Sequence, residues 1–223
     1  MQISFVIATT CLSVLSLIVL IFVGKILFKK ELNEHFSLLA RMPFELLQVK
    51  ERALIFTLVG VFLAANIGVA SIFVWLQIVM GSSMPSLVFG GFVLLNISLL
   101  CIFLTNFFNY RLHFLALMIH ILIAIIVGTI LGSFYLGLRG FGTNLSYIFA
   151  IVSYIFAGVY VLLLLNPKFS SWSKLDKVAQ NGAVSYMRPR VYVVAYTEWL
   201  IIFLNLGFVV FAAISFFLLY QAI

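Results

Sequence analysis

The chain has 223 residues, of which 65% are hydrophobic and only 9% are charged, with a formal net charge of +7. A water-soluble domain of this length carries about a quarter of its residues as charged side chains. This composition therefore excludes a soluble globular protein, and most of the molecular surface must face lipid.

The spacing of the charged residues predicts the membrane spans. Five stretches contain no Asp, Glu, Lys or Arg: 1–24, 53–110, 112–138, 140–167 and 199–223. A helix that crosses the bilayer needs about 20 apolar residues. The second stretch is long enough for two spans, and the turn-forming sequence at 81–86 interrupts it. We predict an all-α, polytopic bundle of six transmembrane helices forming a single domain (1–223), with spans near 3–27, 53–79, 87–108, 112–137, 145–166 and 195–220.

The basic residues predict the orientation of the bundle. When the loops are assigned alternately to the two sides, Arg139 alone falls on one side and the other 12 of the 13 Lys and Arg residues fall on the opposite side. Basic loops remain in the cytoplasm. We therefore expect a multi-pass protein of the cytoplasmic (inner) membrane, with both termini on the outer side and segments 28–52 and 167–194 in the cytoplasm. Anionic lipid accounts for the positive charge, so we expect no nucleic-acid partner.

The first cytoplasmic segment is predicted to be helical over 25–52. Leu32, Phe36 and Leu39 recur at helical spacing, and Pro43 suits the first turn of a new helix that runs into the second span. The apolar face of Leu32, Phe36 and Leu39 has two interpretations. It rests on the membrane as an interfacial helix, or it docks a soluble partner.

The second cytoplasmic segment contains a candidate short helix at 173–177, ended by Asn181-Gly182. Pro189 follows, between Arg188 and Arg190. A proline disfavours helical geometry at the residue before it, so this segment cannot continue as one helix into the last span.

Small residues at every fourth position predict close helix packing, which holds membrane bundles together. Two such stripes are present: Gly60, Ala64 and Gly68 in the second span, and Ala124, Gly128 and Gly132 in the fourth. At about 100° per residue, Asn66 points away from the first stripe. An amide facing lipid is costly, so we expect the second span to contact protein on both faces, at the centre of the bundle.

Five polar residues are candidates for a site within the membrane: Asn66, Asn96, His120, Asn205 and Glu198. Glu198, Asn205 and Ala212 recur every seven residues and so share one face of the last span. Glu198 is interpreted first as a boundary residue paired with Arg111, Arg188 or Arg190. His120 is interpreted first as a packed, hydrogen-bonded side chain, with a role in proton or solute passage as the alternative.

The sequence contains no motif that indicates catalysis, a metal or a cofactor. There is no Cys or His pair at metal-ligand spacing, no nucleophile elbow and no glycine-rich phosphate loop. His113 and His120 lie one above the other on the fourth span, about 10 Å apart by helical rise, which is too far for a shared metal. We therefore expect a protein that is not an enzyme and has no metal site or cofactor.

Three functions remain open. The leading one is a non-catalytic subunit that scaffolds or anchors a membrane complex, with the lipid bilayer and other membrane or cytoplasmic subunits as partners. The alternative is a small transporter or channel for a neutral or amphipathic solute, lined by Asn66, Asn96, His120 and Asn205. The weaker alternative is a lipid-acting enzyme that uses Glu198 at the cytoplasmic interface.

Overall fold

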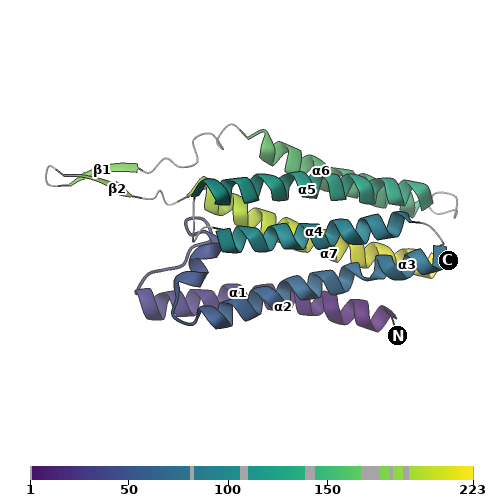
Figure 1. Cartoon of the computed structure of the whole chain (residues 1–223), viewed down its shortest axis with the longest axis horizontal. Coiled ribbons are helices and arrows are strands. Elements are labelled where there is room, and N and C mark those ends of the chain that lie inside the picture. Colours follow the sequence, from purple (N-terminus) through teal and green to yellow (C-terminus); the bar gives the residue numbers. More distant parts are fainter. Residues whose placement is uncertain are drawn as a thin grey trace.

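The structure is a computed structural model that describes residues 2–80, 83–105, 110–138, 144–166, 176–180, 183–187 and 191–222. It contains six helices long and apolar enough to cross a membrane, which confirms the predicted multi-pass helical protein. The elements in chain order are α1 (Gln2–Leu32), the 3-10 helix η1 (Pro43–Gln48), α2 (Arg52–Ala70), α3 (Ile72–Met80), α4 (Met84–Leu104), α5 (Tyr110–Gly137), α6 (Leu145–Leu164), β1 (Asp176–Gln180), β2 (Ala183–Met187) and α7 (Val193–Ala222) (Figure 1).

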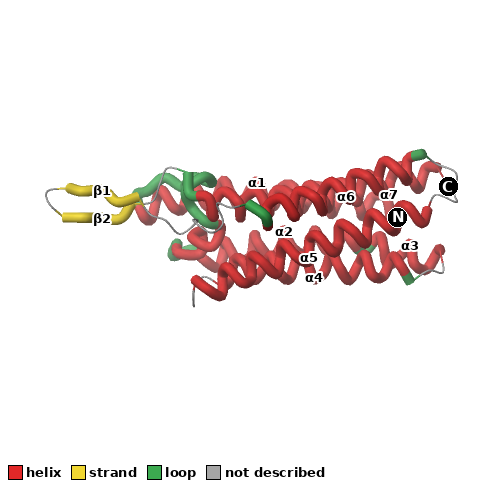
Figure 2. The backbone as a smooth tube through the Cα atoms, turned by 90° about the horizontal axis from the view of Figure 1, so that it is seen from above, coloured by secondary structure: helices red, strands yellow, loops and turns green. Residues whose placement is uncertain are grey.

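The helices run roughly along one axis in three layers. Helices α1 and α2 lie on one side, α5 and α6 lie on the other, and α4 and α7 lie between them (Figure 1). The amino and carboxyl termini are at the same end of the bundle, and the β1–β2 hairpin projects from the opposite end (Figures 1 and 2). Two termini at one end are what an even number of spans requires.

The second span is two helices rather than the single one predicted over 53–79. Helix α2 ends at Ala70 and α3 begins at Ile72. The hydroxyl of Ser71 donates a hydrogen bond back into the preceding turn, to the carbonyl oxygen of Gly68 at 2.7 Å. Such bonds from serine to the preceding turn bend helices, and Ser71 accordingly marks the break.

The prediction of a helix over 25–52 is wrong beyond Leu32, where α1 ends. Asn33 has a φ of 53°, a left-handed conformation that stops a helix and that asparagine tolerates. The chain then turns inward, so Phe36 is buried against the rings of Phe28 and Trp199, while Leu32 and Leu39 remain exposed. These side chains therefore do not form the single docking face that the helical spacing suggested.

Pro43 does begin a helical turn, but this turn does not run on into the second span. It is the short η1, which ends at Gln48, and α2 begins separately at Arg52. Leu46 and Leu47 of η1 are buried, and Leu46 packs against Gly24 of α1, where a Cβ would lie 2.6 Å from its Cδ2. The absence of a side chain at Gly24 allows η1 to tuck into the end of the bundle.

The short helix predicted at 173–177 is also wrong where the structure describes it. Asp176 and Lys177 belong to β1, which pairs antiparallel with β2 so that Gln180 faces Ala183. Residues 173–175, Asn181-Gly182 and Arg188–Arg190 lie outside the described residues. An Asn-Gly pair between two strand-compatible stretches is the strongest short-range hairpin signal, and it outweighs its alternative meaning as a helix stop.

The small-residue stripe of the fourth span lies against α6. A Cβ added to Gly128 would lie 3.1 Å from the Cβ of Ala157, and one added to Gly132 would lie 2.8 Å from the ring of Tyr154. Ala124 is buried on the same side. Glycine at these positions lets the two backbones approach closely.

The stripe of the second span behaves differently. Gly68 packs against Thr9 of α1, but Gly60 and Ala64 are exposed, and a Cβ at Gly60 would meet nothing within 4 Å. The expectation that the second span contacts protein on two faces is nevertheless met, because α2 packs against α1 on one side and against α4 and α7 on another. The central layer consists of α4 and α7, whose rings stack at Phe92 and Phe208 with centroids 5.2 Å apart.

Candidate functional site

The interior of the bundle contains polar side chains at several depths. The five polar residues proposed from the sequence are all buried: Asn66, Asn96, His120, Asn205 and Glu198. Unpaired polar groups are costly away from water, so the partners of each one indicate whether it is structural or available for a ligand.

Asn66 and Asn96 form a cluster whose hydrogen bonds are satisfied. The Asn66 Oδ1 accepts a hydrogen bond from the hydroxyl of Ser13, and the Asn66 Nδ2 donates to the Asn96 Oδ1 at 3.0 Å. The Asn96 Nδ2 donates to the carbonyl oxygen of Phe92 at 2.8 Å. This chain of bonds joins α1, α2 and α4, and its saturation indicates that these two amides hold the helices together.

His120 of α5 presents one unpaired nitrogen to the interior. Its Nδ1 lies 2.8 Å from the hydroxyl oxygen of Ser98, which itself donates to the carbonyl oxygen of Leu95 at 2.8 Å. Because Ser98 has one hydroxyl proton, this arrangement places the imidazole proton on Nδ1. The Nε2 is then an acceptor, and it has no hydrogen-bond partner among the described residues. The ring packs edge-on against Tyr160.

Asn205 of α7 is a buried amide in which both the donor and the acceptor lack a partner among the described residues. It shares its buried face with Glu198 and Ala212. Asn205 lies about 18 Å along α7 from Val193, and His120 lies about 15 Å along α5 from Tyr110, at 1.5 Å rise per residue. Both helices begin at the hairpin end (Figure 1). The two unpaired groups are therefore at similar depths, near the middle of their spans.

Glu198 and His113 form a buried pair about two turns nearer the hairpin end. The Glu198 Oε1 lies 2.6 Å from the His113 Nε2, and both side chains are 0% exposed. The His113 Nδ1 lies 3.4 Å from the hydroxyl oxygen of Thr105. The Glu198 Oε2 has no hydrogen-bond partner among the described residues. The partner of Glu198 is thus a histidine. The sequence favoured Arg111, Arg188 or Arg190 instead. Of these, Arg188 and Arg190 lie outside the described residues.

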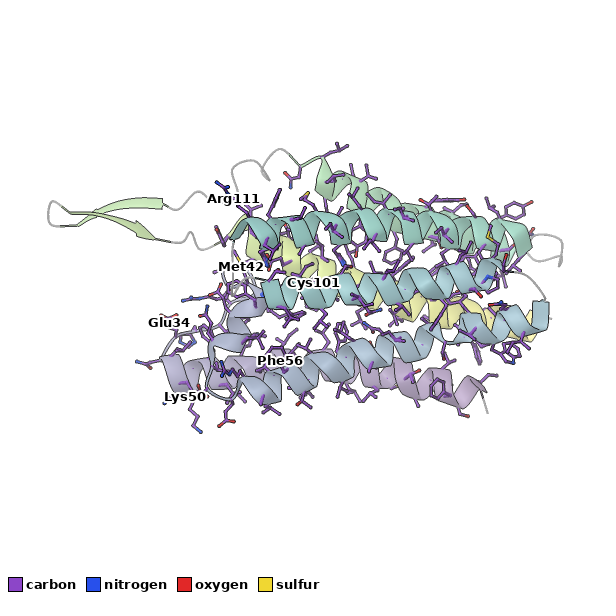
Figure 3. All side chains as sticks on the ribbon, in the orientation of Figure 1. Glu34, Met42, Lys50, Phe56, Cys101 and Arg111 are labelled. Atoms are coloured by element: carbon purple, nitrogen blue, oxygen red, sulfur yellow. The ribbon has the colours of Figure 1, made fainter. Side chains whose placement is uncertain are left out.

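The segment that includes η1 covers this pair. The ring of Phe44 lies edge-on to the His113 ring, with centroids 5.8 Å apart. Glu45 is buried beside it and accepts hydrogen bonds from the Met42 backbone N–H at 2.9 Å and from the Arg41 guanidinium at 3.1 Å. Arg41 also pairs with Glu34. Glu34 and Met42 are at the hairpin end of the bundle, as is Arg111 (Figure 3).

Two further bonds attach this segment to the start of α7. The indole N–H of Trp199 donates to the carbonyl oxygen of Arg41 at 2.9 Å, and the backbone N–H of Tyr192 donates to the carbonyl oxygen of Leu39 at 2.7 Å. Sequence reasoning missed Arg41, Glu45 and His113 as parts of one group. Arg41 and Glu45 are four residues apart, which was a local signal for that pair, but no local spacing links either of them to His113.

A separate apolar cavity of about 280 Å³ lies at the opposite end of the bundle, between α1 and α7. Its lining includes Val6, Thr10, Ala213 and Phe216. The cavity offers almost no polar contact and suits only hydrocarbon.

Within the described residues, no group of three His, Cys, Asp or Glu side chains is arranged to hold a metal ion. No family model matches the chain, and comparison with curated proteins and with solved structures finds no match either. The arrangement of polar side chains inside the bundle is therefore the basis for the functional proposal.

Proposed function

We propose that this chain is a small transporter for a neutral solute that both donates and accepts hydrogen bonds. The observation that carries the proposal is the pair of unpartnered groups at mid-span, the His120 Nε2 and the Asn205 amide. Each unsatisfied buried polar group costs roughly 1–3 kcal/mol. Buried groups left without protein partners call for another partner, such as water or a ligand.

The chemistry of these groups defines the solute class. The His120 Nε2 accepts a hydrogen bond, and Asn205 offers one acceptor and two donors. Neither group carries a charge in this arrangement, so a neutral solute with hydroxyl or amide groups matches them. A charged solute would need a compensating charge at this depth, and the ionisable pair lies nearer the hairpin end.

The segment that includes η1 would then act as the cover of the pathway. It packs across the hairpin end of the bundle through Leu46 and Phe44. A transporter must close one end while the other opens, and short segments that cover the substrate site are a common means of doing so. In this proposal the structure represents the form that is closed at the hairpin end.

Solute permeability of reconstituted vesicles tests this function. The purified chain is placed in liposomes, and volume recovery after an osmotic step is followed by light scattering with glycerol, erythritol and urea as probes. We expect at least one probe to enter faster than in protein-free vesicles and Asn205→Leu to remove the difference. Thr129→Val, which changes an exposed polar residue of α5, is the matched control. Equal permeability of wild-type and protein-free vesicles would rule the proposal out.

A scaffold role in a membrane complex is the second candidate, and one observation favours it. Gly60 and Ala64 are exposed on α2, and among the described residues nothing lies within 4 Å of a Cβ placed at Gly60; small residues of this kind suit close contact with another membrane helix. Replacing Gly60 with leucine should then release a partner subunit during purification in mild detergent. The lipid-acting enzyme has no comparable support, because Glu198 is buried.

A further inference from the structure

We propose that the His113–Glu198 pair binds a proton that is exchanged during transport, so that solute movement is coupled to a proton gradient. This inference rests on the proposed transport function. It is carried by the hydrogen-bond geometry around the imidazole ring of His113, from which we infer how many protons the pair holds.

The hydroxyl oxygen of Thr105 is the hydrogen-bonding group that faces the His113 Nδ1. Thr105 donates its only hydroxyl proton to the carbonyl oxygen of Cys101 at 2.7 Å. Toward the His113 Nδ1, at 3.4 Å, the same oxygen can only accept. The contact is therefore a hydrogen bond when Nδ1 carries a proton.

The other ring nitrogen requires a second proton. The His113 Nε2 and the Glu198 Oε1 are 2.6 Å apart, and two lone pairs at that distance would repel each other. One proton must lie between them, either on the imidazolium or on the carboxyl group. With Nδ1 also protonated, the pair holds one proton more than a neutral imidazole and a carboxylate hold together, and its total charge is zero.

The surroundings of the pair favour this loaded, neutral form. On the η1 side, Glu45 is ionically paired with Arg41, whose charge is shared with Glu34. Just after α4 the facing group is the uncharged Thr105, and on α5 the nearby Arg111 is exposed. No described cation is within salt-bridge distance of Glu198 apart from His113. Loss of the proton would leave a buried negative charge, which is strongly unfavourable without a partner.

Release of the proton therefore requires water at the hairpin end. The segment carrying Phe44 and Glu45 covers the pair, and its displacement would expose the His113 ring. The proton would then pass from the imidazole to water, leaving a neutral histidine beside a hydrated carboxylate. Reloading from the same or the opposite side of the membrane restores the neutral pair.

Two measurements test the proposal, and the first does not depend on transport. Solid-state NMR of chain with ¹⁵N-labelled histidine, reconstituted in liposomes, reports the protonation of each ring nitrogen. His113 is assigned by comparison with His113→Gln. We expect its Nδ1 to be protonated and its Nε2 to share a strongly hydrogen-bonded proton with Glu198. In Glu198→Gln the ring should become neutral, with one protonated nitrogen. A neutral His113 in the wild type, protonated only on Nε2, would overturn the inference.

The second measurement follows proton movement with pyranine trapped inside vesicles, using whichever of glycerol, erythritol or urea the wild type passes. Internal pH should change as that probe enters, and the ratio of protons to solute should fall to the protein-free level in Glu198→Gln. Thr129→Val should keep the wild-type ratio. If the probe enters without a pH change, the coupling is refuted while transport stands. If no probe enters, the transport proposal fails, and the NMR result alone decides whether the proton site exists.

Discussion

The carbonyl oxygen of Arg41 accepts a 2.9 Å hydrogen bond from the indole of Trp199, the residue that follows Glu198 on α7. The chain just before η1 is thus attached directly to the helix that carries the buried carboxylate. Movement of this cover and exposure of the His113–Glu198 pair are consequently linked in part by a hydrogen bond that can be removed without disturbing either ionisable group.

Trp199→Phe should loosen the cover. The substitution keeps an aromatic ring against Phe36 but removes the donor, and loss of a hydrogen bond costs about 1 kcal/mol, or roughly a fivefold shift in an opening equilibrium. Hydrogen–deuterium exchange of residues 41–48 in detergent should accelerate by a similar factor. Trp75→Phe, at the far end of the bundle, should leave the exchange of residues 41–48 unchanged. Equal acceleration of these residues in both variants would mean that the Trp199–Arg41 bond does not hold the cover.

Gly128→Leu should destabilise the bundle, whereas Ile126→Leu should not. The backbone of Ser153 and the Cβ of Ala157 lie within 3.2 Å of a Cβ at position 128, while Ile126 is 57% exposed. Overpacking of this kind costs about 1–3 kcal/mol. Thermal unfolding in detergent should show a lower midpoint for Gly128→Leu alone. The adjacent residue Val127 does not serve as a control for Gly128, because Val127 is itself buried against Gly91.

Gly90 and Gly91 provide a matched pair of adjacent substitutions on α4. A Cβ at Gly91 would lie 2.9 Å from Cγ2 of Val127, whereas one at Gly90 would meet nothing within 4 Å. Alanine at position 90 should raise stability, because glycine within a helix costs roughly 0.5–1 kcal/mol relative to alanine. Alanine at position 91 should lower the unfolding midpoint. The reverse order would place Gly90, not Gly91, at the contact with α5.

Replacement with serine should lower the stability of the fold at Phe36 but not at Leu39. Phe36 is 6% exposed and packs on Phe28 and Trp199, whereas Leu39 is 44% exposed. Truncation of a buried phenylalanine costs about 3–5 kcal/mol, so Phe36→Ser should lower the yield of folded protein and its thermal midpoint. Leu39→Ser should be nearly neutral for folding. A docking role for Leu39 predicts instead a loss of partner binding in mild detergent.

The orientation of the bundle is tested by cysteine labelling in a background that lacks Cys11 and Cys101. Single cysteines at the exposed Ser83 and Asn144, at the end with the termini, should react with a membrane-impermeant reagent from outside intact cells. A cysteine at the exposed Ser37 should react only after lysis, because twelve basic residues are expected to hold that side in the cytoplasm. The reversed pattern would invert the membrane topology.

The number of spans and the polar residues inside them could be predicted from the amino-acid sequence. Hydropathy and charge spacing suffice for the first, because any helix in lipid must be apolar over about 20 residues. The burial of Asn66, Asn96, Asn205 and Glu198 follows from the cost of exposing such groups to hydrocarbon. The four-residue spacing of Ala124, Gly128 and Gly132 likewise indicated a packing stripe, though not which helix would contact it.

Whether a given side chain faces lipid or another helix became known only from the folded chain. Lipid and the bundle interior are equally apolar, so hydrophobicity does not tell a lipid-facing side of a helix from a packed one. This is why the sequence did not reveal that Gly60 and Ala64 are exposed. Phe36, which lies outside the spans, is buried because the chain turns inward after Asn33. The His113–Glu198 pair joins residues 85 positions apart, and Arg41 reaches Trp199 across 158. Such contacts depend on how the layers assemble and on the left-handed turn at Asn33, which directs the chain over the end of the bundle instead of along its surface.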